Sequence, residues 1–304
     1  MLYRRIALPP LMNPPLRDSP ASTPETLPDG SSFLRLSFLP TGGKNAATGA
    51  AAHGTPGAGP RPEACLSFGS WGDMRYLEGG DNPRRSAFFL HLGLLPSAVL
   101  GTELFHTRRV LIEGRRGMEL AGPAPLAGGA SHDGILLCDA AKAACITVAD
   151  CMPIWLLDGH SGSFGVLHSG WKGTGILAIA VKALSEDFGS PPESISVILG
   201  PAIGACCYAV PPERAESFAR EFGTGAVRAE GGRTMLDLRA ANLALARRLG
   251  IGALLSVEAC TSCDPRLGSF RREGPESFTR MAALAAVLPA DCPPGCLVVP
   301  APTL

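Results

Sequence analysis

The sequence has no excess of charge of either sign, because 27 lysine and arginine residues balance 27 aspartate and glutamate residues. Proteins that bind nucleic acids or anionic membranes attract them through surplus positive charge. The balance therefore gives no electrostatic reason to expect nucleic acid or membrane as a partner. A long apolar run is also missing, since the longest, residues 88–100, contains His91 and Pro96 and is too short to span a bilayer.

We expect no export signal either. The first residues carry the positive charge of a signal peptide, but prolines between positions 9 and 15 interrupt the apolar stretch that such a signal needs. We therefore expect a soluble, cytoplasmic protein. In that compartment the ten cysteines should be reduced, and their scattered spacing does not resemble a disulfide framework.

Two cysteine pairs have the spacing of a zinc ribbon. Cys260 and Cys263 form the first pair, and Cys292 and Cys296 form the second. The second pair lies in a Pro-rich tail, whereas the first lies beside other motif residues. The sequence therefore argues against a zinc site built from these two pairs.

Composition divides the chain into three parts. Residues 1–60 are rich in Pro, Gly, Ala, Ser and Thr and can bury little apolar area, so we expect a largely mobile extension with an edge strand at 33–39. Residues 61–289 contain the helix and strand patterns of a folded domain. Residues 290–304 form a Pro-rich tail.

Helix and strand patterns alternate irregularly within the folded domain. Apolar spacing predicts helices at 83–95, 174–188, 212–222, 238–249 and 276–288, and strands at 135–137, 145–148, 154–157, 164–167, 195–199 and 254–257. This order includes a tight hairpin, which argues against a purely parallel, doubly wound sheet. The prediction is an α+β fold, with a mixed β-sheet core and flanking helices in a single domain.

The hairpin is the most informative local pattern. Apolar residues 154–157 and 164–167 flank a cluster of Asp, Gly and Ser at 158–162. Folding the chain about residue 159 or 160 brings Cys151 next to His168, and cross-strand β-carbons lie roughly 4.5–5.5 Å apart. A thiolate and an imidazole at this distance can bind one zinc ion, or they can act as a Cys–His nucleophile pair.

A third zinc ligand has to come from another part of the chain. His53 lies in the predicted extension, His91 in a predicted helix and His160 at the hairpin tip. His106 and His132 remain, and the residues themselves do not decide between them.

Two glycine-rich loops are candidates for ligand binding. The first, Ser169-Gly170-Trp171-Lys172-Gly173, leads into a predicted helix whose N-terminal N–H groups favour an anion. Lys172 adds positive charge there, and Trp171 either stacks on a planar ring or fills the core. The second loop, residues 200–208, follows a strand and ends at Tyr208, which makes it either a site loop or a plain turn.

Several motifs occur in the order typical of one family. They are ADCMP at 149–153, LHSGWKG at 167–173 and GPAIGACCY at 200–208, with DG at 133–134, DLRAAN at 237–242, CTSC at 260–263 and SFRR at 269–272. Together they resemble the signature of the YfiH family over roughly residues 80–285. This family is also called the laccase-domain or polyphenol-oxidase family, and its members are described as purine nucleoside phosphorylases.

The resemblance implies a set of site residues. A His–Cys–His group binds Zn²⁺ in the family, and the match selects His106 over His132 as the partner of Cys151 and His168. These three residues are then both the metal ligands and the catalytic residues. The implied substrate-binding residues are Trp171, Lys172, Cys207, Tyr208, Arg271 and Arg272.

The chain also departs from the family pattern. An Arg-x-Gly-Gly segment expected near residues 67–73 is absent, and Phe88-Phe89 stand where an Asn-Arg pair is usual. The missing arginine implies that Arg75, Arg271 or Arg272 replaces it, or that the chain is a divergent member with altered substrate or weakened activity.

The implied activity is phosphorolysis of purine nucleosides such as adenosine, inosine, guanosine and methylthioadenosine, with adenosine deamination as a further expectation. The motifs of zinc nucleobase deaminases are absent, so deamination would use another scaffold. Two alternatives stay open: a metal-free Cys–His hydrolase that edits peptidoglycan precursors, and a protein that binds ligand without turnover. Multicopper chemistry is excluded, because the chain has six histidines and no His-x-His.

Overall fold

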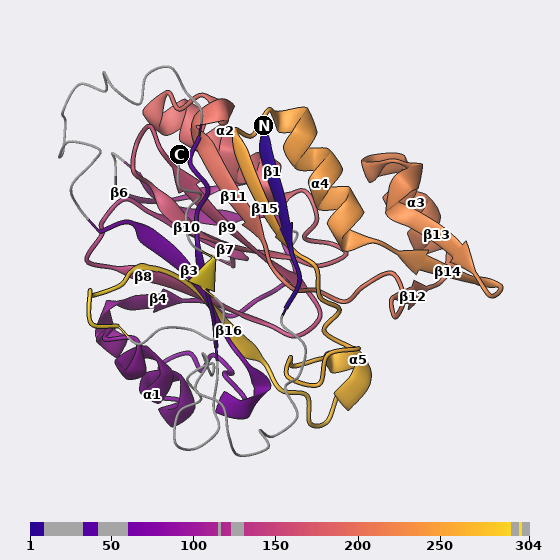
Figure 1. The fold of residues 1–304 in the computed structure, drawn as a ribbon, viewed down its shortest axis with the longest axis horizontal. Helices are drawn as coiled ribbons and strands as arrows, with labels where there is room; N and C mark the ends of the chain where they lie inside the picture. Colours follow the sequence, from indigo (N-terminus) through magenta and orange to yellow (C-terminus); the bar gives the residue numbers. More distant parts are fainter. Residues whose placement is uncertain (9–32, 42–59, 115–116, 123–130, 293–297, 300–304) are drawn as a thin grey trace, which may run out of the picture.

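Several central strands of this protein are apolar along their whole length, which predicts that both of their faces are buried. The computed structural model describes residues 1–8, 33–41, 60–114, 117–122, 131–292 and 298–299. In it, two large sheets pack against each other, and helices cover their outer faces (Figure 1). The α+β prediction with a mixed sheet core is confirmed.

The larger sheet has eight strands in the order β1-β15-β11-β9-β10-β7-β5-β6. Their bounds are β1 Leu2–Ile6, β5 Val110–Gly114, β6 Gly117–Ala121, β7 Gly134–Leu137, β9 Met152–Asp158, β10 Phe164–Ser169, β11 Ile195–Leu199 and β15 Ala253–Val257. β9 runs antiparallel to both of its neighbours, whereas β11 and β15 run parallel. The start of β9 and the ends of β10, β11 and β15 therefore meet at one edge of the sheet.

The smaller sheet has the order β17-β2-β3-β16-β8-β4. Its strands are β2 Phe33–Ser37, β3 Pro62–Ser67, β4 Val99–Gly101, β8 Ala143–Val148, β16 Met281–Val287 and β17 Val298–Val299. Alternate residues of its central strands face either the larger sheet or the outer helix. In β16, for example, Ala283 belongs to the core between the sheets and Leu284 to the core under α1 (Pro83–His91).

Helices α2 (Ile176–Phe188) and α4 (Leu238–Leu249) cover the outer face of the larger sheet. An excursion between β11 and α4 carries β12 (Ala209–Val210), α3 (Pro212–Phe222) and the hairpin of β13 (Val227–Glu230) and β14 (Arg233–Leu236), and it projects to one side in Figure 1. The short helix α5 (Phe270–Glu273) precedes β16. In the described part of the chain, 3₁₀ turns lie at Gly69–Trp71, Pro96–Ala98, Pro192–Ser194 and Thr224–Ala226.

Local chemistry explains where the main helices begin and end. The side chain of Asp237 accepts a hydrogen bond from Ala240 N at 2.9 Å and so caps α4, while Asn82 caps α1 in the same way. Gly189 and Gly250 end α2 and α4 in the left-handed conformation that glycine adopts at least cost.

The helix predicted at 276–288 is wrong, because this segment contains β16. Its Ala-rich sequence has a high helix propensity, but both of its faces are covered, by β-sheet on one side and by α1 on the other. Two neighbouring strands, β3 and β8, supply its backbone hydrogen bonds.

Two segments before residue 61 belong to the sheets. β1 pairs with β15, and β2 pairs with β3 on one side and with β17 on the other. A strand therefore forms at Phe33–Ser37 as expected, but its expected place at a sheet edge is wrong. The rest of the predicted extension, residues 9–32 and 42–59, lies outside the described residues, as does most of the predicted tail. Among the described residues, no helix has the length and apolar character that crossing a membrane requires.

Candidate metal and catalytic site

The β9–β10 hairpin forms, with a register shifted by two residues from the predicted one. His168 pairs with Pro153 and Ser169 with Met152, which places Cys151 opposite Gly170 just beyond the strand ends. A shift of two keeps side chains on the same face, so Cys151 and His168 still point the same way. The sulfur fills the space beside Gly170: a β-carbon there would lie 2.5 Å from Cys151 Sγ.

His106 completes the group. The donor atoms of His106, Cys151 and His168 all lie within 4.8 Å of one another, so the structure brings together the three residues that the resemblance selected. His106 lies on the loop before β5 with φ of 59°, a left-handed conformation that is uncommon outside glycine and is concentrated at functional sites. His132, the other candidate, is not part of this group.

Asp133 holds both histidines in place. One of its carboxylate oxygens accepts hydrogen bonds from His106 N at 2.9 Å and from His168 Nδ1 at 3.0 Å. The other accepts two bonds of 2.7 Å from the backbone and hydroxyl of Thr107. Since a carboxylate only accepts, His168 donates from Nδ1 and its Nε2 is left to bind a metal.

The electrostatics of the group favour a thiolate. Burial acts to raise the pKa of Cys151, but the charge of His168 and hydrogen bonds from both histidines outweigh burial and lower the pKa to about 6. Burial acts to lower the pKa of His168, but Cys151 and Asp133 raise it to about 10. Without a metal, the pair is therefore a thiolate and an imidazolium at neutral pH.

Asp150 connects Cys151 to two further loops. Its carboxylate accepts bonds of 2.6 Å from Thr261 Oγ1 and from Arg271 N, and its carbonyl accepts one of 2.8 Å from Ile203 N. The Asp150 side chain is buried, and its backbone φ is 80°, a strained conformation for a residue other than glycine. The hydrogen bonds to its carboxylate and to its carbonyl hold the residue in this conformation. The loops after β11 and β15 are thereby attached to the residue before Cys151.

The two aromatic candidates, Trp171 and Tyr208, lie on the loops next to this group. The guanidinium of Arg214 lies 3.9 Å from the ring centroid of Trp171, and Lys172, which is exposed, lies 5.6 Å from it. Tyr208 is half-buried. Burial raises its pKa and the charge of Cys151 adds to the effect, whereas Arg214 and Arg271 oppose it.

Arg271 and Arg272 are engaged with the backbone. Arg271 donates to the carbonyls of Cys207 at 3.1 Å and Ala209 at 3.3 Å. Arg272 donates to several carbonyls of the segment 261–267, including that of Thr261 at 2.6 Å. Arg75 lies in a loop that Asn82 holds through the Arg75 carbonyl.

Sequence reasoning missed Arg214 and the role of Asp133. Arg214 lies on α3, and its sequence context is that of an ordinary surface arginine on a helix, which does not indicate a functional role. Only the fold shows that it lies over the Trp171 ring. Asp133 had a signal, since it precedes Gly134 in a turn before β7, but its bond to His168 depends on the pairing of β7 with β10.

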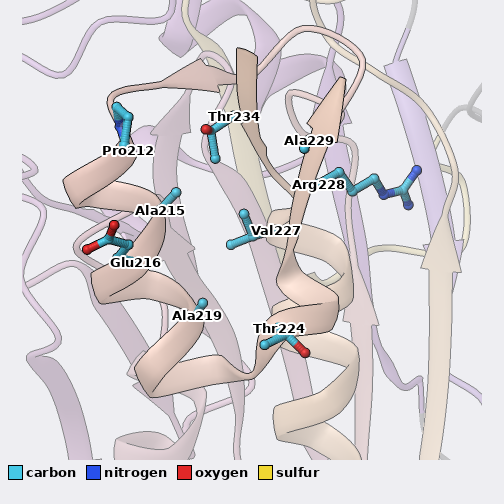
Figure 2. A pocket seen from close by; sticks show the side chains of 9 residues that line it. All are labelled: Pro212, Ala215, Glu216, Ala219, Thr224, Val227, Arg228, Ala229 and Thr234. Carbon is cyan, nitrogen blue, oxygen red and sulfur yellow. The ribbon is translucent and has the colours of Figure 1, made fainter. Parts of the chain in front are cut away.

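A groove of about 360 Å³ lies in a different place. Figure 2 shows it between α3 and the β13–β14 hairpin, with small and apolar side chains such as Ala215, Ala219 and Val227 along it. No residue that lines it belongs to the His106–Cys151–His168 group, and we assign it no function.

The fold and site together define a class: a two-sheet α+β domain with a histidine–cysteine–histidine group at one sheet edge. The chain belongs to the family described as multi-copper polyphenol oxidoreductase laccase, whose model matches residues 82–294. In fold it is similar to the YfiH protein of Bacillus licheniformis, with a TM-score of 0.64 and 24% identity over 74% of this chain and 92% of that one. It is also similar to the YlmD protein of Geobacillus stearothermophilus, with a TM-score of 0.62 and 24% identity over the same shares of the two chains.

Three curated relatives share one name. A mouse protein named purine nucleoside phosphorylase is 35% identical over 44% of this chain, which spans only 33% of that protein's length. The purine nucleoside phosphorylase of Corynebacterium glutamicum is 30% identical over 64% of this chain and 79% of its own length. That of Aquifex aeolicus is 34% identical over 42% of this chain and 58% of its own.

Proposed function

We propose that this protein is a zinc-dependent purine nucleoside phosphorylase, which cleaves the N-glycosidic bond of a purine nucleoside with phosphate. The observation that carries the proposal is the convergence of His106, Cys151 and His168 within 4.8 Å, on the segments that hold the family motifs. The names of the curated relatives support the reaction class.

The residues fit zinc. Two imidazole nitrogens and one thiolate are ligands that Zn²⁺ prefers, and three protein ligands leave a fourth position open, as in catalytic zinc sites. The space that Gly170 leaves for the sulfur and the bond that orients His168 both favour such a site. When bound there, zinc supplies a Lewis acid that stabilises negative charge on the reacting oxygen.

The surrounding residues would bind and orient the two substrates. Tyr208 and Trp171 offer aromatic faces for the purine. Arg214 and Lys172 lie beside Trp171 and supply positive charge for phosphate, and we infer that Arg214 replaces the arginine missing from the family pattern. Arg271, which fastens the carbonyl of Cys207, would hold Tyr208 in position, and Arg272 would hold the adjoining loop.

One observation favours a second candidate. The low pKa of Cys151 beside a buried histidine is also the arrangement of a Cys–His nucleophile, which a metal-free hydrolase would use. The two candidates differ in metal content and in the product. Cytoplasmic location and adenosine deamination remain further expectations of the phosphorylase proposal.

One experiment tests the proposal directly. Protein of known zinc content is incubated with adenosine, inosine, guanosine or methylthioadenosine, with and without phosphate, and the products are identified by mass spectrometry. Phosphorolysis predicts a ribose 1-phosphate that forms only with phosphate, while inosine from adenosine would report deamination. His168→Ala should lose most of the activity and most of the zinc bound by the His106–Cys151–His168 group. Cys138→Ser, which alters an exposed thiol outside this group, should keep both. Zinc-loaded protein that cleaves none of the four nucleosides would refute the proposal.

A further inference from the structure

A second group of metal-binding side chains lies on the two loops that Asp150 fastens. The sulfur atoms of Cys206, Cys207, Cys260 and Cys263 all lie within 4.8 Å of one another. This is not the zinc ribbon considered from the sequence. Cys292 is buried with the core residues under α1, and Cys296 lies outside the described residues.

The topology brings these cysteines together. β11 and β15 are parallel neighbours, so the loops that follow them leave the same edge of the sheet. A bridge between Ala202 and Cys260 continues the pairing beyond the strands. Cys206 and Cys207 then arrive from one loop, and Cys260 and Cys263 from the other.

The sulfur spacing matches a tetrahedral metal site. With Zn–S near 2.3 Å, the sulfurs of a tetrahedral four-cysteine site lie about 3.8 Å apart. Here Cys263 Sγ lies 3.7 Å from Cys206 Sγ and 3.4 Å from Cys207 Sγ. A disulfide would need about 2.05 Å, and all four cysteines are free.

The surroundings suit a negatively charged cluster. Gly204 N donates to Cys260 Sγ at 3.2 Å. Four thiolates around a divalent cation carry a net charge of about −2. Three arginines, on α4 and α5, approach the two loops. Arg239 donates to Ala259 O at 3.2 Å, and Arg271 and Arg272 donate to Cys207 O and Thr261 O.

A thiophilic ion can reach the group from solvent. Cys206 and Cys263 are exposed, and Cys260 and Cys263 line an open depression of about 300 Å³ together with Asp264 and Arg266. Sulfur-only tetrahedral ligand sets select zinc or iron among the metals common in cells, and a site with four protein ligands leaves no position for substrate.

We propose that Cys206, Cys207, Cys260 and Cys263 bind one structural Zn²⁺ ion, separate from the His106–Cys151–His168 site. The ion fastens the loop after β11 to the loop after β15. Tyr208 follows Cys207 directly, and Thr261 and Arg271 hold Asp150, so this ion also fixes the wall of the catalytic site.

Metal counting on the full-length protein tests the proposal. Protein purified with zinc present and passed over a desalting column is expected to hold about two zinc ions per chain by elemental mass spectrometry. Cys206→Ser/Cys263→Ser should lose one of them, and His106→Ala should lose the other. Both substituted cysteines are exposed, so folding should survive, which circular dichroism checks. Cys138→Ser, an exposed cysteine outside both groups, should lose none.

Cobalt gives an independent readout. Co²⁺ bound by His106→Ala protein should show the intense thiolate-to-cobalt charge-transfer absorption of four sulfurs, and Cys206→Ser/Cys263→Ser should abolish it. Full zinc in the cysteine variant, a disulfide among the four cysteines in freshly purified protein, or no cobalt spectrum in the His106→Ala variant would each overturn the second site. None of these results depends on phosphorolysis, so the two proposals fail separately.

Discussion

At the scale of single residues, Asp133 positions both histidines of the candidate zinc site. Its Oδ1 accepts from His106 N and from His168 Nδ1, so one buried carboxylate sets the backbone of the first ligand and the ring orientation of the second. Asp133→Asn keeps the shape but removes the charge, and we expect zinc affinity to fall about 10–100-fold. Competition with a chromophoric chelator measures it, with exposed Asp291→Asn as the matched control. Equal affinities in the two variants would contradict the positioning role.

Gly170 makes room for the sulfur of Cys151. Gly170→Ala places a β-carbon 2.5 Å from Cys151 Sγ, so the thiolate has to move and the three-residue zinc site should lose most of its metal. Overpacking of this kind costs typically ~1–3 kcal/mol. Gly225→Ala is the control, because nothing lies within 4 Å of its added carbon. Metal content and thermal unfolding are measured for both, and normal zinc in Gly170→Ala would contradict the predicted clash.

Cys151 should be the reactive thiol of metal-free protein. Its pKa of about 6, set by His168 and His106 against the effect of burial, leaves it largely thiolate at pH 7. The pKa of Cys138 is raised instead, by burial and by Glu113. After the metal is removed with a chelator, the modification of Cys151 by iodoacetamide should rise with pH with a midpoint near pH 6, whereas Cys138 should react only at much higher pH. Peptide mass spectrometry measures the modification of each cysteine. Zinc should protect Cys151, and equal pH profiles for the two cysteines would contradict the assignment.

Residues joined by local structure were predictable, and those joined only by the fold were not. The turn at 158–162 sets the hairpin, so Cys151 and His168 follow from the sequence even though the register differs by two. His106 required a family resemblance. The contact of Arg214 with Trp171 depends on where α3 lies, and the proximity of Cys206 to Cys263 depends on the pairing of β11 with β15. No short sequence pattern encodes either arrangement.

At the scale of elements, α4 braces the end of β10. Asn242 Nδ2 donates to Leu238 O at 2.8 Å and lies 3.2 Å from Ser169 Oγ, next to His168, and both side chains are buried. Asn242→Ala leaves the hydroxyl unpaired and should cost about 1–3 kcal/mol of unfolding free energy. Ser169→Ala should cost less. Denaturant titrations measure the unfolding free energy of each variant. We expect the double variant to be hardly less stable than Asn242→Ala, whereas strictly additive losses of unfolding free energy would show that the two side chains are uncoupled.

Element prediction succeeded where caps agree with apolar spacing and failed where tertiary contacts override propensity. Asp237 and Gly250 bound α4 as the sequence indicates. β16 is the counterexample. Its Ala-rich sequence predicts a helix, yet the segment is a strand because it pairs with β3 on one side and β8 on the other. β1 was missed because a short strand at a sheet edge has little pattern of its own, and its parallel pairing with β15 supplies the hydrogen bonds.

At the scale of the whole molecule, both cysteine-containing groups lie at one edge of the larger sheet and Asp150 links them. Metal binding should therefore stabilise the protein as a unit. A site that binds only the folded state adds about 2.7 kcal/mol when free zinc is 100 times its Kd, and each kcal/mol shifts Tm by roughly 2–4 °C in domains of moderate size.

Wild-type protein should lose the contributions of both sites in strong chelator. Cys206→Ser/Cys263→Ser and His106→Ala should each lose only one, and the variant that combines all three substitutions should hardly respond. Differential scanning fluorimetry with and without chelator measures these shifts. A combined variant that responds as strongly as wild type would show that the stabilising metal binds elsewhere.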